Sequence, residues 1–261
     1  MGIRLIVLDL DKTLLHNNGV ISDYSIRVLT QCRERGILIA IATARSEFSA
    51  KRYVDLIEPD IVITSGGAIA RCGNKIFHKA LIPKITLNAI IQDALKEQSI
   101  ECIRVMGEIH ELSNNKNVPE GQKDYGHYDY SDLLSPLDEG AWKIQFETAN
   151  IQFLKELKMK YSECELISYT NENLHKMSNI HANKRDAILG TCDKYGLTIE
   201  EVAAFGDDYS DYELINIAGM GVAVENAIEP IKIIANFVCE SNEDDGVAKF
   251  IKKHILKGKS I

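Results

Sequence analysis

The chain of 261 residues lacks the cysteine patterns that mark a disulfide-rich or a zinc-binding protein. Its six cysteines are scattered and form no Cys-x-x-Cys pair, so we expect free thiols in a reducing compartment. A long N-terminal hydrophobic run is missing as well. The apolar run that precedes Asp9 is too short for a signal peptide or a membrane span. These absences predict a cytoplasmic protein that does not enter a membrane.

An excess of positive charge is also missing. The sequence holds 30 Lys and Arg residues against 38 Asp and Glu residues, a net charge of −8. General nucleic-acid binders usually carry a basic patch or a basic excess, so we expect no nucleic-acid partner. A small anionic substrate is compatible with this charge, because a local site can be cationic in an acidic protein. Hydrophobic content of 45% is ordinary for a soluble globular chain, which we expect to be a monomer or a small homo-oligomer.

Both ends of the chain alternate apolar strands with helices. Strands are expected at residues 3–8, 37–43, 61–67, 202–207, 220–226 and 237–240, and helices at 22–36, 47–57, 184–196, 209–219, 228–235 and 244–256. This alternation is typical of parallel sheets with right-handed crossovers. We therefore predict an α/β fold in which the two ends share one doubly wound, Rossmann-like parallel sheet.

The middle of the chain does not follow that alternation. Helices are expected at 87–98 and 151–162, and strands at 101–107, 109–115, 142–148, 164–170 and 174–178. This mixture predicts an α+β cap domain inserted into the α/β core. The expected domains are a core of residues 1–81 and 179–261 and a cap of residues 82–178.

Several carboxylates follow predicted strands. Asp9 and Asp11 follow the first strand, Asp207 and Asp208 follow a late one, and Asp211 comes one turn later. Parallel strands end at one sheet edge, where ligands bind. Two like charges ~4 Å apart repel by about 4 kcal/mol at an effective dielectric near 20. A hard cation with oxygen ligands relieves this repulsion, which predicts Mg²⁺. Taken alone, Asp208 or Asp211 is better explained as a helix cap or loop residue.

Hydroxyl and amide donors at the same edge suit a phosphate. Thr13, Thr43 and Ser65 offer hydroxyls, and the backbone of residues 66–67, two glycines, can approach a ligand and donate N–H bonds. Lys184 begins a predicted helix, whose N-terminus favours anions. On its own, this lysine would be interpreted as a solvated surface residue.

Four motifs occur in an order that resembles one family. "DLDKT" starts at Asp9, "IATAR" contains Thr43, Lys184 stands alone, and "GDDYSD" starts at Gly206. In this order and context they resemble the motifs of the haloacid-dehalogenase-like (HAD) phosphohydrolases. The inserted middle resembles the cap of their Cof-type subgroup. The resemblance spans essentially the whole chain and implies a Mg²⁺-dependent phosphatase of small phosphorylated metabolites, such as sugar phosphates, nucleotides or cofactor phosphates.

The resemblance also implies a role for each acidic residue of the motifs. Asp9 would be the nucleophile that becomes an aspartyl phosphate, and a metal ligand. Asp11 would be the general acid and base, with its backbone carbonyl also on the metal. Asp207 would be a further metal ligand, assisted by Asp208 or Asp211. The implied substrate-binding residues are Thr43, Ala44, Arg45, Ser65, Gly66, Gly67, Lys184 and Asn226.

Four positions depart from the family pattern. Lys12 stands where glycine is the commonest choice, and Ser210 stands where asparagine is usual. Val224 and Glu225 replace a Met-Gly pair before Asn226. We expect Ser210 to weaken the support of the metal site without abolishing it. Glu225 adds a negative charge that would affect the fit of the substrate.

Substrate choice is expected to depend on the cap. Candidate residues are Tyr125, His127, Tyr128, Tyr130, Trp142 and Lys143. A tyrosine-rich loop is more often explained by local packing, and the alternation of Trp142, Ile144 and Phe146 is more often explained by one buried strand face.

Two other functions are compatible with the same motifs. A phosphomutase or phosphotransferase would return the phosphoryl group from Asp9 to an alcohol instead of water. A non-catalytic regulatory module would only bind phosphate or be phosphorylated on Asp9. The presence of Asp11 favours a phosphoryl-transfer enzyme. Neither a regulatory receiver domain that is phosphorylated on Asp9 nor a dehalogenase needs an acid/base group two residues after that aspartate.

Overall fold

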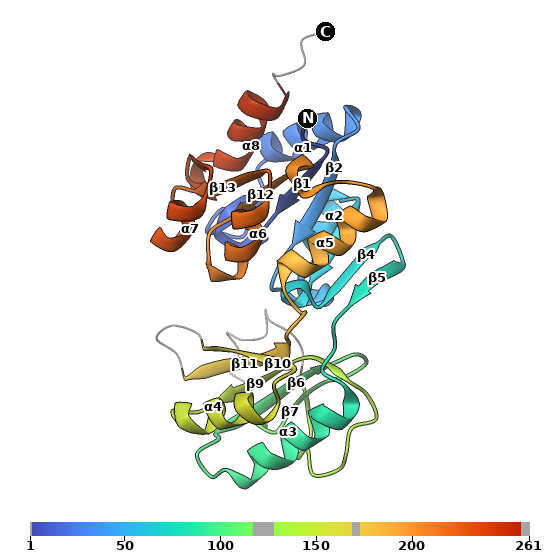
Figure 1. Cartoon of the computed structure of the whole chain (residues 1–261), viewed down its shortest axis with the longest axis vertical. Helices are drawn as coiled ribbons and strands as arrows, with labels where there is room; N and C mark the ends of the chain where they lie inside the picture. Colours follow the sequence, from blue (N-terminus) through green and yellow to red (C-terminus); the bar gives the residue numbers. More distant parts are fainter. Residues whose placement is uncertain (1, 117–127, 169–172, 257–261) are drawn as a thin grey trace. The chain divides into compact units, whose positions relative to one another are not determined.

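The computed structural model describes three stretches of the chain, residues 2–116, 128–168 and 173–256. The chain divides into two compact units (Figure 1). One comprises Met1–His78 with Asn183–Ile261, and the other comprises Lys79–Ala182. We call them the core unit and the cap unit. The division expected from the sequence, at 81/82 and 178/179, differs from these bounds by a few residues.

The core unit is built around one eight-stranded sheet (Figure 1). In spatial order its strands are β14 (Phe237–Cys239), β13 (Met220–Val224), β12 (Val202–Gly206), β1 (Leu5–Leu8), β2 (Leu38–Ala42), β3 (Ile61–Thr64), β4 (Ile69–Cys72) and β5 (Lys75–Lys79). From β14 to β3 all strands run parallel, whereas β4 runs antiparallel to β3. This confirms the predicted doubly wound parallel sheet. The β4–β5 pair was not predicted.

Helices cover both faces of this sheet. Those of the core unit are α1 (Asp23–Glu34), α2 (Glu47–Ile57), α5 (Lys184–Tyr195), α6 (Tyr212–Ile217), α7 (Glu229–Ile234) and α8 (Gly246–Phe250). Along β1, Ile6 and Leu8 join one buried cluster with residues of α1, α2 and α8. Leu5 and Val7 join a second cluster with residues of α5 and α6. A strand buried on both faces needs apolar residues at every position, which explains the uninterrupted run.

Short helical turns connect these elements. They lie at Leu10–Leu14, Ser65–Gly67, Ile199–Glu201, Tyr209–Asp211, Asn242–Asp244 and Ile251–Leu256. Three of them directly follow β1, β3 and β12, close to the ends of the strands. They place polar residues at the edge of the sheet where the sequence predicts a site.

The cap unit is an α+β module. Its sheet has the order β10 (Cys164–Ser168), β11 (Leu174–Asn179), β9 (Ala141–Glu147), β6 (Cys102–Gly107), β7 (Glu111–Ser113) and β8 (Asp129–Tyr130), and its helices are α3 (Lys84–Lys96) and α4 (Ile151–Lys160). Ile144 and Phe146 of β9 are buried in one cluster with residues of both helices, so this strand face is structural. Tyr125 and His127 lie outside the described residues. Among the helices of the described stretches, none is both long and apolar enough to cross a membrane.

Candidate active site

The polar residues of the motifs meet at one edge of the core sheet. Leu8 of β1 is paired with Phe205 of β12 and with Ile41 of β2. Asp9 directly follows the last residue of β1, Asp207 that of β12, and Thr43 that of β2. The parallel register of three neighbouring strands therefore brings the ends of three motifs together.

Lys184 joins two carboxylates in the interior of this edge. Its Nζ donates to Asp9 Oδ1 at 2.5 Å and to Asp211 Oδ1 at 2.6 Å. The lysine is the first residue of α5 and only 1% exposed. Burial alone would lower the pKa of Lys184, but the charges of Asp211 and Asp9 outweigh burial and raise it. The side chain is therefore a buried cation, not the surface lysine that the sequence alone would suggest.

Asp211 is fixed from a second side. Its Oδ2 accepts hydrogen bonds from the backbone N–H of Asp207 at 3.2 Å and of Asp208 at 3.4 Å. Gly206 makes this approach possible, because a Cβ at that position would lie 2.4 Å from Asp211 Cγ. The glycine of the "GDDYSD" motif therefore accommodates the carboxylate that holds Lys184.

Asp9, Asp207 and Asp211 form a buried acidic group. Each offers one carboxylate oxygen, and these oxygens lie within 4.8 Å of one another. Burial raises the pKa of Asp207 to about 7, with a contribution from the charge of Asp211 and an opposing one from Thr13, whose hydroxyl donates to Asp207 Oδ1 at 3.0 Å. Burial also raises the pKa of Asp9 well above its usual value, and Lys184 offsets only part of this effect.

This group fits a magnesium ion. Three carboxylates face one ammonium group, so negative charge is left over in a buried place. Carboxylate oxygens are the ligands that Mg²⁺ takes in proteins, usually with waters and a substrate phosphate completing the octahedron.

Two of the predicted acidic residues lie outside this group. The carboxylate of Asp11, 51% exposed, is held by Arg45, whose Nε donates to Oδ2 at 2.8 Å and whose Nη2 donates to Oδ1 at 2.6 Å. Asp208 accepts a hydrogen bond from the N–H of Tyr209 at 2.7 Å and caps the turn that follows. The structure thus brings Asp211, not Asp208, beside the other two carboxylates.

The segment after β2 is tied to the segment after β3. Thr43 is buried, and its hydroxyl accepts from the N–H of Arg45 at 3.2 Å. Ser65 N donates to the carbonyl of Arg45 at 2.7 Å, and Gly66 N donates to that of Thr43 at 3.0 Å. Ala44 is exposed between them. The N–H of Gly66, expected to donate to a phosphate, is thus bonded to the backbone.

Gly67 has a packing role. Its φ is +103°, and a Cβ there would lie 2.1 Å from the carbonyl carbon of Asn183. Asn183 is the N-cap of α5, where it accepts from the N–H of Asp186 at 2.8 Å. Gly67 therefore allows the start of α5, and with it Lys184, to approach the end of β3.

Asn226 is exposed, but both ends of its side-chain amide bind the protein. Its Nδ2 donates to the carbonyl of Lys12 at 2.7 Å, and its Oδ1 accepts from the N–H of Asn242 at 3.0 Å. Asn242 belongs to no motif, so its role could not be predicted from the sequence. Two of the departures from the family pattern, Ser210 and Glu225, are exposed.

Comparison with known proteins decides the family. The chain matches the model of the haloacid dehalogenase-like hydrolases over residues 6–251. It belongs to this family. The 5-amino-6-(5-phospho-D-ribitylamino)uracil phosphatase YwtE of Bacillus subtilis is 27% identical, with 98% of this chain and 99% of the relative covered. The pyridoxal phosphate phosphatase YbhA of Escherichia coli is 26% identical, with 98% and 100% covered.

Solved structures agree on the fold. A haloacid dehalogenase-like hydrolase from Bacteroides thetaiotaomicron superposes with a TM-score of 0.82 at 22% identity, covering 97% of this chain and 99% of that one. A sugar phosphatase of HAD subclass IIB superposes with a TM-score of 0.79 at 22% identity, covering 95% and 98%. These HAD-like hydrolases share a Rossmann-like core with an inserted cap, as predicted from the sequence.

Proposed function

We propose that this HAD-like hydrolase is a Mg²⁺-dependent phosphatase of small phosphorylated metabolites that works through an aspartyl phosphate on Asp9. One observation carries the proposal: Asp9 is buried and held by Lys184, beside two further carboxylates that need a cation. The relatives act on a phosphorylated ribitylaminouracil and on pyridoxal phosphate, and a structural neighbour is a sugar phosphatase. Their substrates are all small phosphate monoesters, which is the substrate class proposed for this chain.

Asp9, Asp207 and Asp211 are the residues that would hold the magnesium ion. Bound there, Mg²⁺ would neutralise the excess carboxylate charge and polarise a phosphate oxygen. Lys184 adds a fixed positive charge beside Asp9. With Thr43 it is proposed to hold the phosphoryl oxygens, so that the nucleophile and an anionic substrate can approach each other.

The chemistry then proceeds in two displacements. Because Lys184 holds Oδ1 of Asp9, we expect Oδ2 to attack phosphorus while the bond from phosphorus to the leaving oxygen breaks. Asp11 enters this step as the carboxylic acid and gives its proton to the leaving oxygen. In the second step Asp11 takes a proton from water, the water oxygen attacks phosphorus, and the bond to Asp9 breaks. Inorganic phosphate leaves, Asp9 is again a carboxylate, and Asp11 is again the carboxylic acid.

Phosphate release from a panel of monoesters tests the proposal. The panel contains the phosphoribitylaminouracil, pyridoxal phosphate and several sugar phosphates, each assayed with Mg²⁺ and with a chelator. We expect release that requires Mg²⁺ and is lost in Asp9→Asn, but is kept in Asp55→Asn, a change at an exposed carboxylate on α2. Release that survives Asp9→Asn would overturn the proposed nucleophile. Transfer of phosphate to an added alcohol without release would indicate a phosphotransferase instead.

A further inference from the structure

The turn that carries Asp11 contains a residue in a disfavoured conformation. Lys12 has φ +57° and ψ 6°, in the left-handed region where a Cβ is unfavourable and glycine is the ordinary choice. Asp11 directly precedes it. A return of Lys12 to the right-handed region would therefore change the direction in which the peptide and the carboxylate of Asp11 point. Contacts from other parts of the chain must therefore stabilise the turn Leu10–Leu14 in this conformation.

Two asparagines from the C-terminal part of the core unit hold it. Asn226 donates to the carbonyl of Lys12 at 2.7 Å and accepts from the N–H of Asn242 at 3.0 Å. The side chain of Asn242, a residue only 2% exposed, donates to the carbonyl of Leu15 at 2.8 Å. Asn242 thus reaches both ends of the stretch 12–15, one end directly and the other through Asn226.

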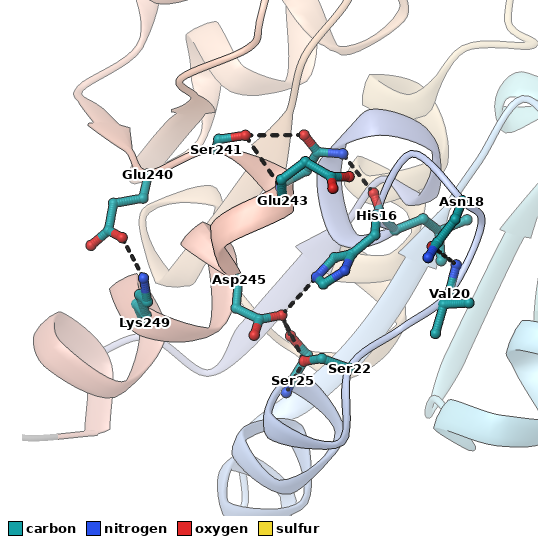
Figure 2. A network of polar contacts seen from close by, with 12 residues as sticks. His16, Asn18, Val20, Ser22, Ser25, Glu240, Ser241, Glu243, Asp245 and Lys249 are labelled. Atoms are coloured by element: carbon teal, nitrogen blue, oxygen red, sulfur yellow. Dashed lines mark hydrogen bonds and ion pairs between the residues drawn. The ribbon is translucent and has the colours of Figure 1, made fainter.

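Asn242 itself has a fixed place. It begins the short turn Asn242–Asp244, and Asp245 follows that turn. In Figure 2, Asp245 lies beside His16, Ser22 and Ser25. Its Oδ1 accepts from Ser22 Oγ at 2.6 Å and from Ser25 Oγ at 3.2 Å, and lies 3.1 Å from His16 Nε2. These contacts fix the turn Asn242–Asp244 to the segment that follows Leu15. Asn242 therefore has little freedom to move.

We propose that Asn242 is a positioning residue for Asp11, acting through Asn226 and the carbonyl of Leu15. The proposal rests on the proposed function, because it concerns the proton that Asp11 transfers. Asn242 touches no reacting atom. Its contribution is to keep Lys12 in the left-handed conformation that aims Asp11, a task that a glycine at position 12 would make easier.

The choice of leaving group separates positioning from simple stabilisation. An alkyl alkoxide is a poor leaving group that needs the proton of Asp11, whereas p-nitrophenolate leaves readily without it. Hydrolysis of the aspartyl phosphate, in which Asp11 acts as the base, is common to both esters, so the comparison uses kcat/KM, which covers only the steps up to departure of the leaving group. A displaced Asp11 should therefore lower kcat/KM much more for alkyl phosphates than for p-nitrophenyl phosphate. A general loss of folded protein would slow both equally.

Asn242→Asp is the sharpest variant. It keeps the shape and the backbone N–H bond to Asn226 but replaces the donor by an oxygen that faces the Leu15 carbonyl. We expect kcat/KM for glycerol phosphate to fall about 10-fold and kcat/KM for p-nitrophenyl phosphate to fall less than about 3-fold. Asn236→Asp is the matched control, because it adds the same charge and keeps the acceptor that binds Gly221 N at 2.7 Å.

Amide exchange gives a readout that does not depend on turnover. In Asn242→Asp the amides of residues 12–15 should exchange at least about 10-fold faster, while those of β1 are unchanged. Lys12→Gly in the same chain should restore the ratio of the kcat/KM values for the two esters to within about 3-fold of the wild type, because the left-handed conformation then needs no support. If Asn242→Asp does not fold, Asn226→Ala is tested in its place, because it removes the side chain that connects Asn242 to the carbonyl of Lys12.

The results separate the two proposals. An equal fall of kcat/KM for both esters, unchanged exchange of residues 12–15, or no recovery with Lys12→Gly would each overturn the role of Asn242. A wild type that hydrolyses neither ester nor any monoester of the panel would overturn the proposed function. Amide exchange would then still show whether Asn242 holds the Asp11 turn.

Discussion

Arg45 and Asp11 form a bidentate ion pair, with Nε 2.8 Å from Oδ2 and Nη2 2.6 Å from Oδ1. Arg45 follows β2 and Asp11 follows β1, so the pair joins the ends of two neighbouring parallel strands. A planar guanidinium fixes both the position and the plane of a carboxylate. The carboxylate proposed to transfer protons therefore has a defined orientation although it is 51% exposed.

Replacing the guanidinium of Arg45 by an ammonium group removes the bidentate contact with Asp11 but keeps the positive charge. We expect Arg45→Lys to lower kcat about 10-fold and to leave KM within about 2-fold, because a misplaced acid/base group affects the transition state more than binding. Steady-state kinetics on the best monoester of the panel measure this. Arg52→Lys is the control, because Arg52 lies over the same Tyr53 ring as Arg45, at 4.5 Å and 5.1 Å. A rise in KM with unchanged kcat would show that Arg45 binds substrate instead.

The parallel sheet could be predicted from the sequence because its signal is local. β1, β2 and β3 are uninterrupted apolar segments, and their burial on both faces explains that pattern. The β4–β5 hairpin was missed for the same reason. β5 mixes exposed lysines with apolar residues and shows no clear alternation, so its pairing with β4 depends on contacts rather than on its own pattern.

The residues of the site could be predicted from motif positions, but their contacts could not. Asp208 and Asp211 are equivalent in a sequence argument, and only the space left by Gly206 shows which one reaches Lys184. Asn242 carries no signal at all. It contacts Leu15 across 227 positions of the chain, a relationship that depends on how the C-terminal turn packs in three dimensions.

Lys184 should contribute strongly to the stability of the metal-free protein. Lys184→Met leaves the carboxylates of Asp9 and Asp211 buried without their cation, so we expect the free energy of unfolding to fall by about 3 kcal/mol. Mg²⁺ should restore part of this loss, because it can replace the missing charge. Urea unfolding with and without Mg²⁺ measures both effects. Lys194→Met, at an exposed position of the same helix, should change stability by less than about 1 kcal/mol; equal losses in the two variants would contradict the prediction.

Gly206 should be required for metal binding. In Gly206→Ala the new methyl group would lie 2.4 Å from Asp211 Cγ, so the carboxylate must move away from Lys184 and from the other two acids. We expect a loss of about 1–3 kcal/mol in stability from overpacking and a loss of most of the rise in Tm that Mg²⁺ gives the wild type. Thermal unfolding over a range of Mg²⁺ concentrations tests this. Gly2→Ala, where a Cβ meets no atom within 4 Å, should keep the full effect of the metal.

Lys143 should make the stability of the cap unit depend on pH. Burial lowers its pKa from 10.5 to about 8, and the charge of Glu111 offsets only part of that effect. Between these two values the unfolded chain binds more protons at this residue than the folded chain, so the free energy of unfolding rises with pH there. Lys143→Met removes this contribution. The variant should be more stable than the wild type at about pH 7, and its advantage should shrink as the pH approaches about 10.

Fluorescence of the single tryptophan, Trp142, next to Lys143 on β9, reports the transition in urea. Lys155→Met, at an exposed position of α4, provides the comparison, and its difference from the wild type should be the same at every pH. An advantage of Lys143→Met that stays constant from about pH 7 to about 10 would mean that the folded state does not lower the pKa of this lysine. The other groups that titrate in this range are present in both variants. The difference in stability between the two variants therefore isolates the contribution of Lys143.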